Sequence, residues 1–245
     1  MNDSDGPVAE LTNIGKSYQL DQVTVPVLHE IDLLVRPRRF TVVLGPSGSG
    51  KTTLLNLIGC IDRPDNGSVL IAGVDVGALS DDDLADFRAR HIGFIFQNFN
   101  LLPVLSAYEN VEYPLLMAGV PAKVRADRVP KLLEAVGLSD RASNLPGQLS
   151  GGQRQRVAIA RALARKPKLV IADEPTANLD SSTGAAILAL MRHMQVRYGI
   201  SFLFSSHDRD VIGAADDTIF LKDGSIHTVR RRAPYSAAPV ASAVE

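Results

Sequence analysis

The residues whose types and spacing best suit chemistry form a glycine-rich run that ends in a lysine and a threonine. In order, the run consists of Gly45, Pro46, Ser47, Gly48, Ser49, Gly50, Lys51 and Thr52. It matches the pattern G-x-x-x-x-G-K-[ST], in which backbone N–H groups and a helix start cradle phosphate oxygens. Lys51 can reach the β- and γ-phosphates of a nucleotide, and the Thr52 hydroxyl can ligate Mg²⁺. This run therefore predicts a site for a nucleoside triphosphate.

Two adjacent carboxylates supply the second half of the same chemistry. Asp173 and Glu174 follow an apolar run that ends at Ala172, so the pattern predicts a buried strand with both side chains at its carboxyl end. We expect Asp173 to hold Mg²⁺ through water and Glu174 to act as the general base for the attacking water.

A second helix start also suits anion binding. Ser150 is a good N-cap residue, the pair Gly151 and Gly152 follows it, and Gln153 comes next. One nucleoside triphosphate does not need two such cradles within one chain. We therefore expect the second cradle to serve a nucleotide that another subunit holds.

Strands and helices must position these groups. Phe40–Leu44 is typical of a strand buried on both faces, and apolar periodicity predicts a helix over Lys51–Ile61 that stops before Pro64. We predict the other elements as follows: strands at Leu11–Leu20, Val23–Val35, Ser68–Ala72, Lys168–Ala172 and Ile200–Ser205; helices at Ala107–Ala118, Ala122–Val136 and about Ser182–Arg197; and a closing hairpin of Thr218–Leu221 with Ser225–Val229. Three aspartates after Ser80 indicate a helix start rather than a metal site.

The composition excludes several classes of protein. The chain has 245 residues, 45% of them hydrophobic, and a formal net charge of −1, which argues against an ordinary basic nucleic-acid-binding protein. The single cysteine, Cys60, excludes a disulfide framework and fits a reducing compartment. The sequence has neither the roughly 18 consecutive apolar residues of a membrane span nor the pattern of a secretory signal, so we expect a cytoplasmic protein.

The motifs together resemble those of the ATP-binding cassette (ABC) transporter ATPases over nearly the whole chain. Six motifs occur in the order and spacing of that family. They are the phosphate loop, Gln97, the signature Leu149–Gln153, Asp173 with Glu174, the aspartate loop Asn178–Asp180, and His207. The resemblance implies an α/β fold, namely a P-loop NTPase ABC cassette with an N-terminal antiparallel β-region and an inserted helical subdomain. It places one domain at residues 1–232, with the nucleotide-binding core at about 8–97 and 166–229, the helical subdomain at about 98–165, and a disordered tail at 233–245.

The resemblance also implies the cofactors and site roles. Two copies of the chain are expected to pack head to tail, with two ATP molecules between the phosphate loop of one copy and Ser150–Gln153 of the other. Gln97 is expected to contact Mg²⁺ or the attacking water, His207 to hold the γ-phosphate, and Asp180 to connect the two sites. Tyr18 is expected to stack on adenine, and Thr53 belongs to the nucleotide site with Thr52.

Further segments are similar to the lipoprotein-releasing and macrolide-export group within this family. These segments are Leu101–Pro103, Glu109–Val111, the run from Gln153 to Ala162, and Ala172–Thr176. Ala177 departs from the glycine usual in that group, which weakens the subgroup assignment but not catalysis. Membership implies ATP hydrolysis that drives separate permease chains, for export or extraction, from the cytosolic face of the membrane.

Two alternatives remain. The first is an ABC-type regulatory ATPase that acts with a membrane partner but transports nothing. The second is a soluble ABC protein of DNA repair or translation, which the single phosphate loop and the absence of a heptad stretch disfavour. A small-molecule phosphotransferase does not explain Leu149–Gln153. We expect no nucleic-acid partner.

Overall fold

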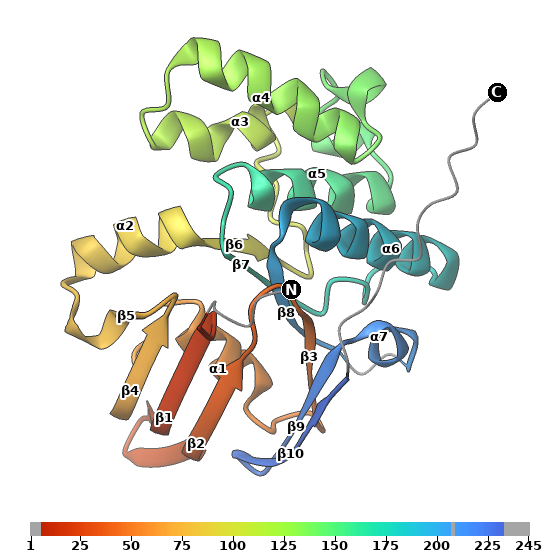
Figure 1. Ribbon diagram of the computed structural model, residues 1–245. Coiled ribbons are helices and arrows are strands. Elements are labelled where there is room, and N and C mark those ends of the chain that lie inside the picture. The colour runs from red at the N-terminus through yellow and green to blue at the C-terminus, as the bar shows by residue number, and fades with distance from the viewer. Residues whose placement is uncertain (1–5, 207–208, 233–245) are drawn as a thin grey trace.

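The computed structural model describes residues 6–206 and 209–232 (Figure 1). The predictions for His207 and for a disordered tail at 233–245 lie outside these residues.

A six-stranded sheet forms the centre of the described chain. Its order is β10-β9-β3-β8-β7-β6; β9, β3, β8, β7 and β6 are parallel, and β10 is antiparallel to β9. The strands are β3 (Phe40–Leu44), β6 (Ile92–Ile95), β7 (Leu169–Asp173), β8 (Ser201–Ser205), β9 (Asp217–Lys222) and β10 (Ser225–Arg231). The short apolar runs of the sequence thus form parallel strands covered on both faces, as parallel sheets require.

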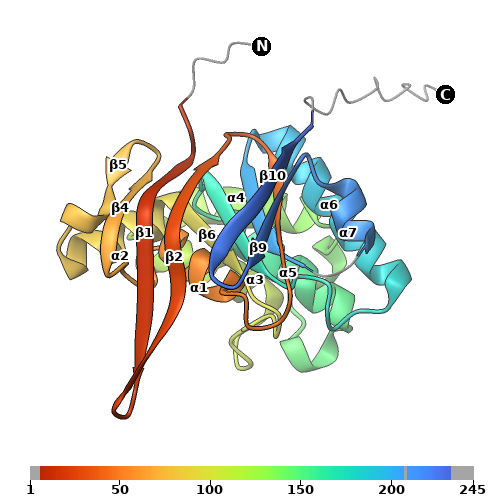
Figure 2. The ribbon, with the colours of Figure 1, turned by 90° about the horizontal axis from the view of Figure 1, so that it is seen from below.

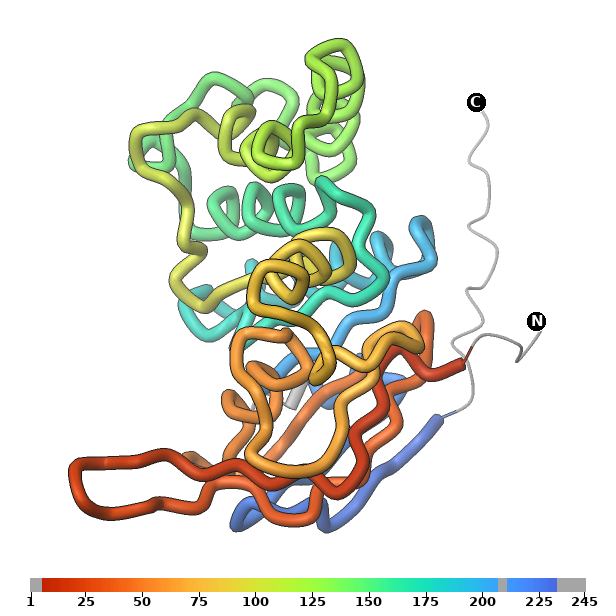
Figure 3. The backbone as a smooth tube through the Cα atoms, turned by 90° about the vertical axis from the view of Figure 1, so that its left-hand side faces the viewer, coloured from red at the N-terminus to blue at the C-terminus, as the bar shows by residue number. Residues whose placement is uncertain are grey.

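A second, antiparallel sheet confirms the expected N-terminal β-region. Its order is β2-β1-β4-β5, with β1 (Ala9–Leu20), β2 (Val23–Val35), β4 (Asn66–Ile71) and β5 (Val74–Asp75). The β1–β2 hairpin extends beyond the rest of the molecule in Figures 2 and 3. Near the turn of the hairpin, Leu20 and Val23 are exposed.

The helices cover both faces of the central sheet. They are α1 (Lys51–Ile58), α2 (Asp81–His91), α3 (Ala107–Met117), α4 (Ala122–Ala135), α5 (Gly151–Leu163), α6 (Ser181–Tyr198) and α7 (Arg209–Ala214), with short 3₁₀ turns at Val76–Ala78, Ser139–Arg141 and Pro146–Gln148. The insertion between β6 and β7 is helical, as expected, and α3 and α4 lie above α5 in Figure 1.

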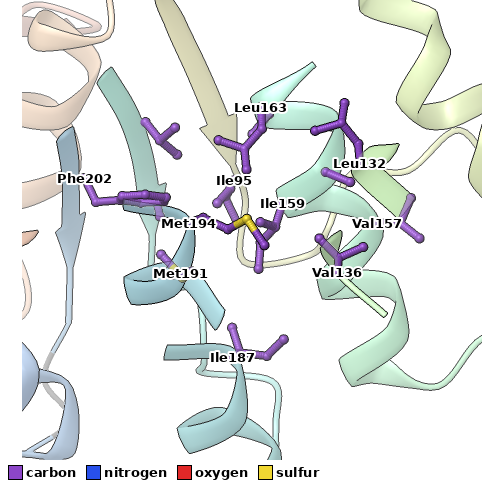
Figure 4. Packing of buried hydrophobic residues seen from close by; sticks show 14 of the residues in the cluster. Ile95, Leu132, Val136, Val157, Ile159, Leu163, Ile187, Met191, Met194 and Phe202 are labelled. Carbon is purple, nitrogen blue, oxygen red and sulfur yellow. The ribbon is translucent and has the colours of Figure 1, made fainter. Parts of the chain in front are cut away.

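Two hydrophobic clusters lie on opposite faces of the central sheet. Strand alternation divides them: Val170 and Phe202 face one cluster, and Ile171 and Leu203 face the other. The first cluster joins the sheet to α3, α4, α5 and α6, and the second encloses α1 between the two sheets. The helical insertion therefore shares its core with the sheet through α5 (Figure 4).

The structure differs from the sequence predictions at several boundaries. Helix α1 ends at Ile58 rather than Ile61, because Gly59 caps it and Cys60 adopts a left-handed φ of 55°. Strands β5 and β6 and helix α7 were not predicted; β6 follows α2 without a turn residue between them. The prediction that Ser80 caps a helix is confirmed, since its hydroxyl accepts a hydrogen bond from the Asp83 N–H.

Replacing Ile159 by alanine is expected to destabilise the fold by about 2–5 kcal/mol, because it leaves a cavity between α5 and the sheet. Ile159 is fully buried and projects toward Ile95 and Met194 in Figure 4. Urea unfolding measures the change. As a matched control, Val104→Ala at a side chain that is 80% exposed should change the unfolding free energy by less than about 0.5 kcal/mol. Equal losses in the two variants would contradict a shared core through α5.

Candidate functional site

The carboxyl ends of the parallel strands bring most of the predicted site residues to one edge of the sheet. In the register, Ser205 of β8 lies opposite both Val43 of β3 and Asp173 of β7. The phosphate loop leaves β3 two residues beyond Val43. Ligand sites of open parallel sheets lie at this edge. The phosphate loop, Asp173 and Glu174 therefore converge, although the chain separates them widely.

Close packing fixes the phosphate loop. Gly50 has a φ of 97°, and a Cβ at this position would lie 2.8 Å from Leu28 Cδ2 and 3.1 Å from the Val27 carbonyl oxygen. Only glycine accepts both the backbone conformation and the approach of β2. The Lys51 ammonium donates hydrogen bonds to the carbonyl oxygens of Gly45 (2.9 Å) and Pro46 (2.8 Å), so it lies within the loop rather than in solvent.

The residues at this edge fit a magnesium nucleotide. The Thr52 hydroxyl lies 3.3 Å from Asp173 Oδ2, which pairs two hard oxygen ligands of the kind Mg²⁺ prefers. The Ser49 hydroxyl is buried and bonds to no other described residue, so its polar atom suits a ligand in the loop. Among the described residues no group of three or more His, Cys, Asp or Glu side chains could hold a metal.

Ser205 links the two carboxylate positions. Its hydroxyl donates to Asp173 Oδ1 at 2.5 Å and accepts from the Glu174 backbone N–H at 3.1 Å. Glu174 itself has a left-handed φ of 48°. Non-glycine residues in this region are strained, and such strain clusters at functional sites. Ser205 therefore holds the strained Glu174 backbone immediately after Asp173, the carboxylate that we expect to bind Mg²⁺.

Gln97 lies just beyond the carboxyl end of β6, which pairs with β7. The Asn178 side-chain amide donates to the Gln97 carbonyl oxygen (3.0 Å) and to Asn98 Oδ1 (3.1 Å). From α5, the Arg161 guanidinium donates to the Phe99 carbonyl oxygen (2.8 Å) and to that of Asn100. The loop that carries Gln97 therefore contacts both the aspartate-loop segment and the signature helix.

The signature residues begin α5 as predicted. Ser150 caps the helix: its hydroxyl accepts from the Gln153 N–H, and the Gln153 side chain accepts from the Ser150 N–H. A Cβ at Gly152 would lie 2.6 Å from Thr183 Cγ2, so the start of α5 packs against the beginning of α6. In the phosphate loop, Gly45 instead packs against β9 and Gly50 against β2. The start of α5 and the phosphate loop therefore pack against different elements of the chain.

Asp180 caps α6. Its carboxylate accepts from the Ser182 hydroxyl (2.7 Å) and the Thr183 N–H (2.9 Å). These hydrogen bonds lower the pKa of Asp180 well below its usual range. The residue therefore stays ionised at the exposed start of the helix, beside the start of α5.

Tyr18 lies on β1, opposite Val25 of β2. The same strand β2 contacts Gly50 through Val27 and Leu28, so the expected base-stacking residue lies close to the phosphate loop. Burial raises the pKa of Tyr18, and its phenol donates to Asp62 Oδ2 at 2.9 Å. The Thr53 side chain on α1 interacts with the same phenol.

Sequence reasoning missed three residues that hold the site together. From the sequence, Ser205 was identified only as the last residue of an apolar strand, and Asn178 only as a member of the aspartate loop. Gln155 is fully buried on α5, and its amide donates to the Pro175 carbonyl oxygen at 2.6 Å. A polar residue within the buried stripe of a helix was the available signal for Gln155.

Comparison with known proteins identifies the family. The family model described as ABC transporter matches residues 28–177. An ABC transporter ATP-binding protein of Thermotoga maritima is 48% identical over 225 residues, which cover 92% of this chain and 96% of that protein. The chain belongs to the ATP-binding proteins of the ABC transporters.

Two further relatives carry more specific names. The lipoprotein-releasing system ATP-binding protein LolD of Anaeromyxobacter dehalogenans is 49% identical, over 90% of this chain and 92% of that protein. The macrolide export ATP-binding/permease protein MacB of Rhodopirellula baltica is 46% identical over 91% of this chain, which spans 33% of that protein.

Solved structures agree with the fold. The ATP-binding cassette MJ0796, in a dimeric post-hydrolysis state bound to ADP and Pi, aligns with a TM-score of 0.83 and 39% identity, covering 93% of this chain and all of that one. The fold is therefore an ABC cassette with an antiparallel β-region and a helical insertion. In the described part of the chain, no helix has the length and apolar character of a membrane span.

Ser205→Ala is expected to slow ATP hydrolysis about fivefold to a hundredfold, because Asp173 and the Glu174 N–H lose their shared partner. It should also raise the Mg²⁺ concentration that gives half-maximal activity. Steady-state ATPase assays across a Mg²⁺ series measure both effects. Ser139→Ala, at an exposed serine of the helical insertion, is the control. Unchanged rate and Mg²⁺ dependence in Ser205→Ala would contradict the linking role.

Proposed function

We propose that this protein is the ATP-hydrolysing subunit of a transporter that exports or extracts its substrate through separate permease chains. One observation carries the proposal: Lys51, Thr52, Asp173 and Glu174 converge at one sheet edge, whereas the start of α5, which carries the signature, packs against α6. Such an arrangement is half of a nucleotide site, and a second copy supplies the other half.

In the proposed reaction, Glu174 accepts a proton from water as the water oxygen attacks the γ-phosphorus of ATP. The bond to the β-γ bridging oxygen breaks, and ADP and phosphate leave. Lys51 and the loop N–H groups hold the phosphates. Thr52, Asp173 and Gln97 would hold Mg²⁺, which would neutralise developing negative charge. Ser205 keeps the Asp173 carboxylate oriented. His207, outside the described residues, holds the γ-phosphate in the same proposal.

The proposed dimer places Ser150–Gln153 of one copy against ATP in the other. The capped start of α5 presents backbone N–H groups suited to the γ-phosphate. The dimeric state of the MJ0796 cassette supports this pairing. Asp180, beside the start of α5, lies where the two sites communicate, and Tyr18 stacks on adenine.

An exposed apolar stripe on α3 supports a permease partner. Tyr113, Leu116 and Met117 are 41%, 49% and 68% exposed, while Val111 and Leu115 on the opposite side of the helix are buried. Tyr113 and Met117 also line a groove of about 880 Å³ that reaches Phe96 and Asn100, on either side of Gln97. We assign this groove to a cytosolic segment of the permease, since an exposed apolar patch marks an interaction surface.

The direction of transport rests on the relatives. The names of LolD and MacB specify lipoprotein release and macrolide export, and both proteins match nearly all of this chain. On that basis we propose that the protein acts at the cytosolic face of the membrane, with residues 98–165 as the helical subdomain that contacts the permease. The proposal of separate permease chains follows LolD, 92% of which this chain covers, rather than MacB, whose name joins ATP-binding and permease parts in one protein.

Glu174→Gln is expected to bind ATP and to dimerise, but to hydrolyse ATP at least 100-fold more slowly, because the amide cannot accept the proton. Size-exclusion chromatography with and without ATP measures dimerisation, and phosphate release measures turnover. Glu112→Gln, on α3 and paired with Arg125, is the matched control for a carboxylate far from the edge. Turnover equal to that of the parent would contradict the general-base assignment.

Met117→Glu is expected to abolish stimulation of the ATPase by the purified permease, because a charge would replace an apolar side chain at the proposed contact and would be buried when the permease binds. Basal ATPase activity should stay unchanged, since Met117 lies outside the nucleotide site. Val196→Glu, at an apolar side chain on α6 that is 51% exposed, is the matched control. Full stimulation of Met117→Glu would place the permease on another surface.

A further inference from the structure

Two charged side chains, Asp62 and Lys16, contact Tyr18, the expected base-stacking residue, and form a cluster with it. The Tyr18 phenol donates to Asp62 Oδ2 at 2.9 Å, and the Lys16 ammonium donates to Asp62 Oδ1 at 2.8 Å. The Lys16 ammonium also lies 5.1 Å from the centre of the Tyr18 ring. Both oxygens of one carboxylate are thus occupied by β1 side chains that are two residues apart.

The carboxylate belongs to the turn that leaves α1. The backbone N–H groups of Ile61 and Asp62 donate to the Asn56 carbonyl oxygen on α1, at 2.9 and 3.3 Å. Lys16 also donates to the Arg63 carbonyl oxygen at 2.7 Å. Strand β1 is therefore joined to the end of the helix that begins at the phosphate loop.

The cluster restricts the ring in two ways. The hydrogen bond to Asp62 fixes the phenol oxygen, and the ammonium covers one face of the ring, so a base must stack on the opposite face. Burial raises the pKa of Asp62, but hydrogen bonds from Lys16, Tyr18 and the Arg63 N–H lower it by more. Asp62 thus remains a charged acceptor at neutral pH.

We propose that Asp62, with Lys16, is a positioning residue for the nucleotide base: it holds the Tyr18 ring at a fixed place relative to α1 and the phosphate loop. The inference rests on the proposed stacking of adenine on Tyr18 and deepens it. Asp62 contacts no part of ATP in this arrangement. It makes the base subsite and the phosphate subsite one preorganised unit, so that binding ATP need not order the ring.

The test compares ATP with tripolyphosphate, which has the phosphates but no base. Tyr18→Phe keeps the ring and removes only the hydroxyl, and Asp62→Ala removes its acceptor. Each variant should weaken ATP binding about three- to tenfold in calorimetric titration, because the ring must be ordered on binding. Tripolyphosphate binding should not weaken. The KM for ATP should rise while kcat at saturating ATP stays unchanged.

A double-mutant cycle and a matched control complete the test. Tyr18→Phe and Asp62→Ala both remove the same hydrogen bond, between the Tyr18 phenol and Asp62. The variant that carries both substitutions should therefore bind ATP no more weakly than whichever single variant binds ATP more weakly. The matched control is Asp32→Ala, which removes an equal charge from the same sheet. The Asp32 carboxylate accepts a hydrogen bond from the Asn13 N–H at 2.8 Å. This control should leave the ratio of the dissociation constants for ATP and tripolyphosphate unchanged.

Tyr18→Ala distinguishes the two levels of the proposal. It should weaken ATP binding roughly tenfold or more through lost stacking. If Tyr18→Ala binds ATP like the parent, the base-stacking assignment fails. If Tyr18→Ala weakens binding but Tyr18→Phe does not, stacking stands and the positioning role of Asp62 is overturned. Tyr18→Phe decides this point even if Asp62→Ala fails to fold.

Discussion

The adjacency of β3, β8 and β7 is the constraint on which the rest of the site depends. Ser205 can bond Asp173 and the Glu174 N–H only because β8 lies between the strand that enters the phosphate loop and the strand that ends in the carboxylates. A shift of one residue in this register would move each side chain to the other face of the sheet. The parallel pairing, covered by apolar clusters on both faces, therefore sets the chemistry at the edge.

Helix α5 connects that edge to the rest of the chain. Its apolar residues pack between the sheet and the helices α3 and α4, while Gln155 reaches the Pro175 carbonyl oxygen and Arg161 holds the loop after Gln97. The helix that begins with the signature thus contacts both segments that flank the proposed hydrolytic residues. Its start packs against the beginning of α6 rather than against β2 and β9 beside the phosphate loop, which is the geometric reason to expect a second copy.

The sequence predicted those parts of the fold that local patterns determine. Phe40–Leu44, the phosphate loop and the N-caps Ser80 and Ser150 depend on neighbouring residues, and the structure has them as expected. Strand β6 was missed because four residues that continue directly from a helix carry no boundary signal. The bonds of Ser205 and Asp62 could not be predicted, because they join residues that only the tertiary fold brings together. Roles that depend on ATP, Mg²⁺ or a second chain stay predictions.

The left-handed conformation of Glu174 places opposing demands on that position. Glycine or asparagine adopts this backbone with less strain, so the residue best for folding differs from the one proposed for proton transfer. Selection for thermal stability alone would favour glycine or asparagine at position 174. Laboratory evolution of a more thermostable variant would therefore have to keep Glu174 unchanged. At position 174, the backbone conformation therefore sets the stability of the fold against the rate of ATP hydrolysis.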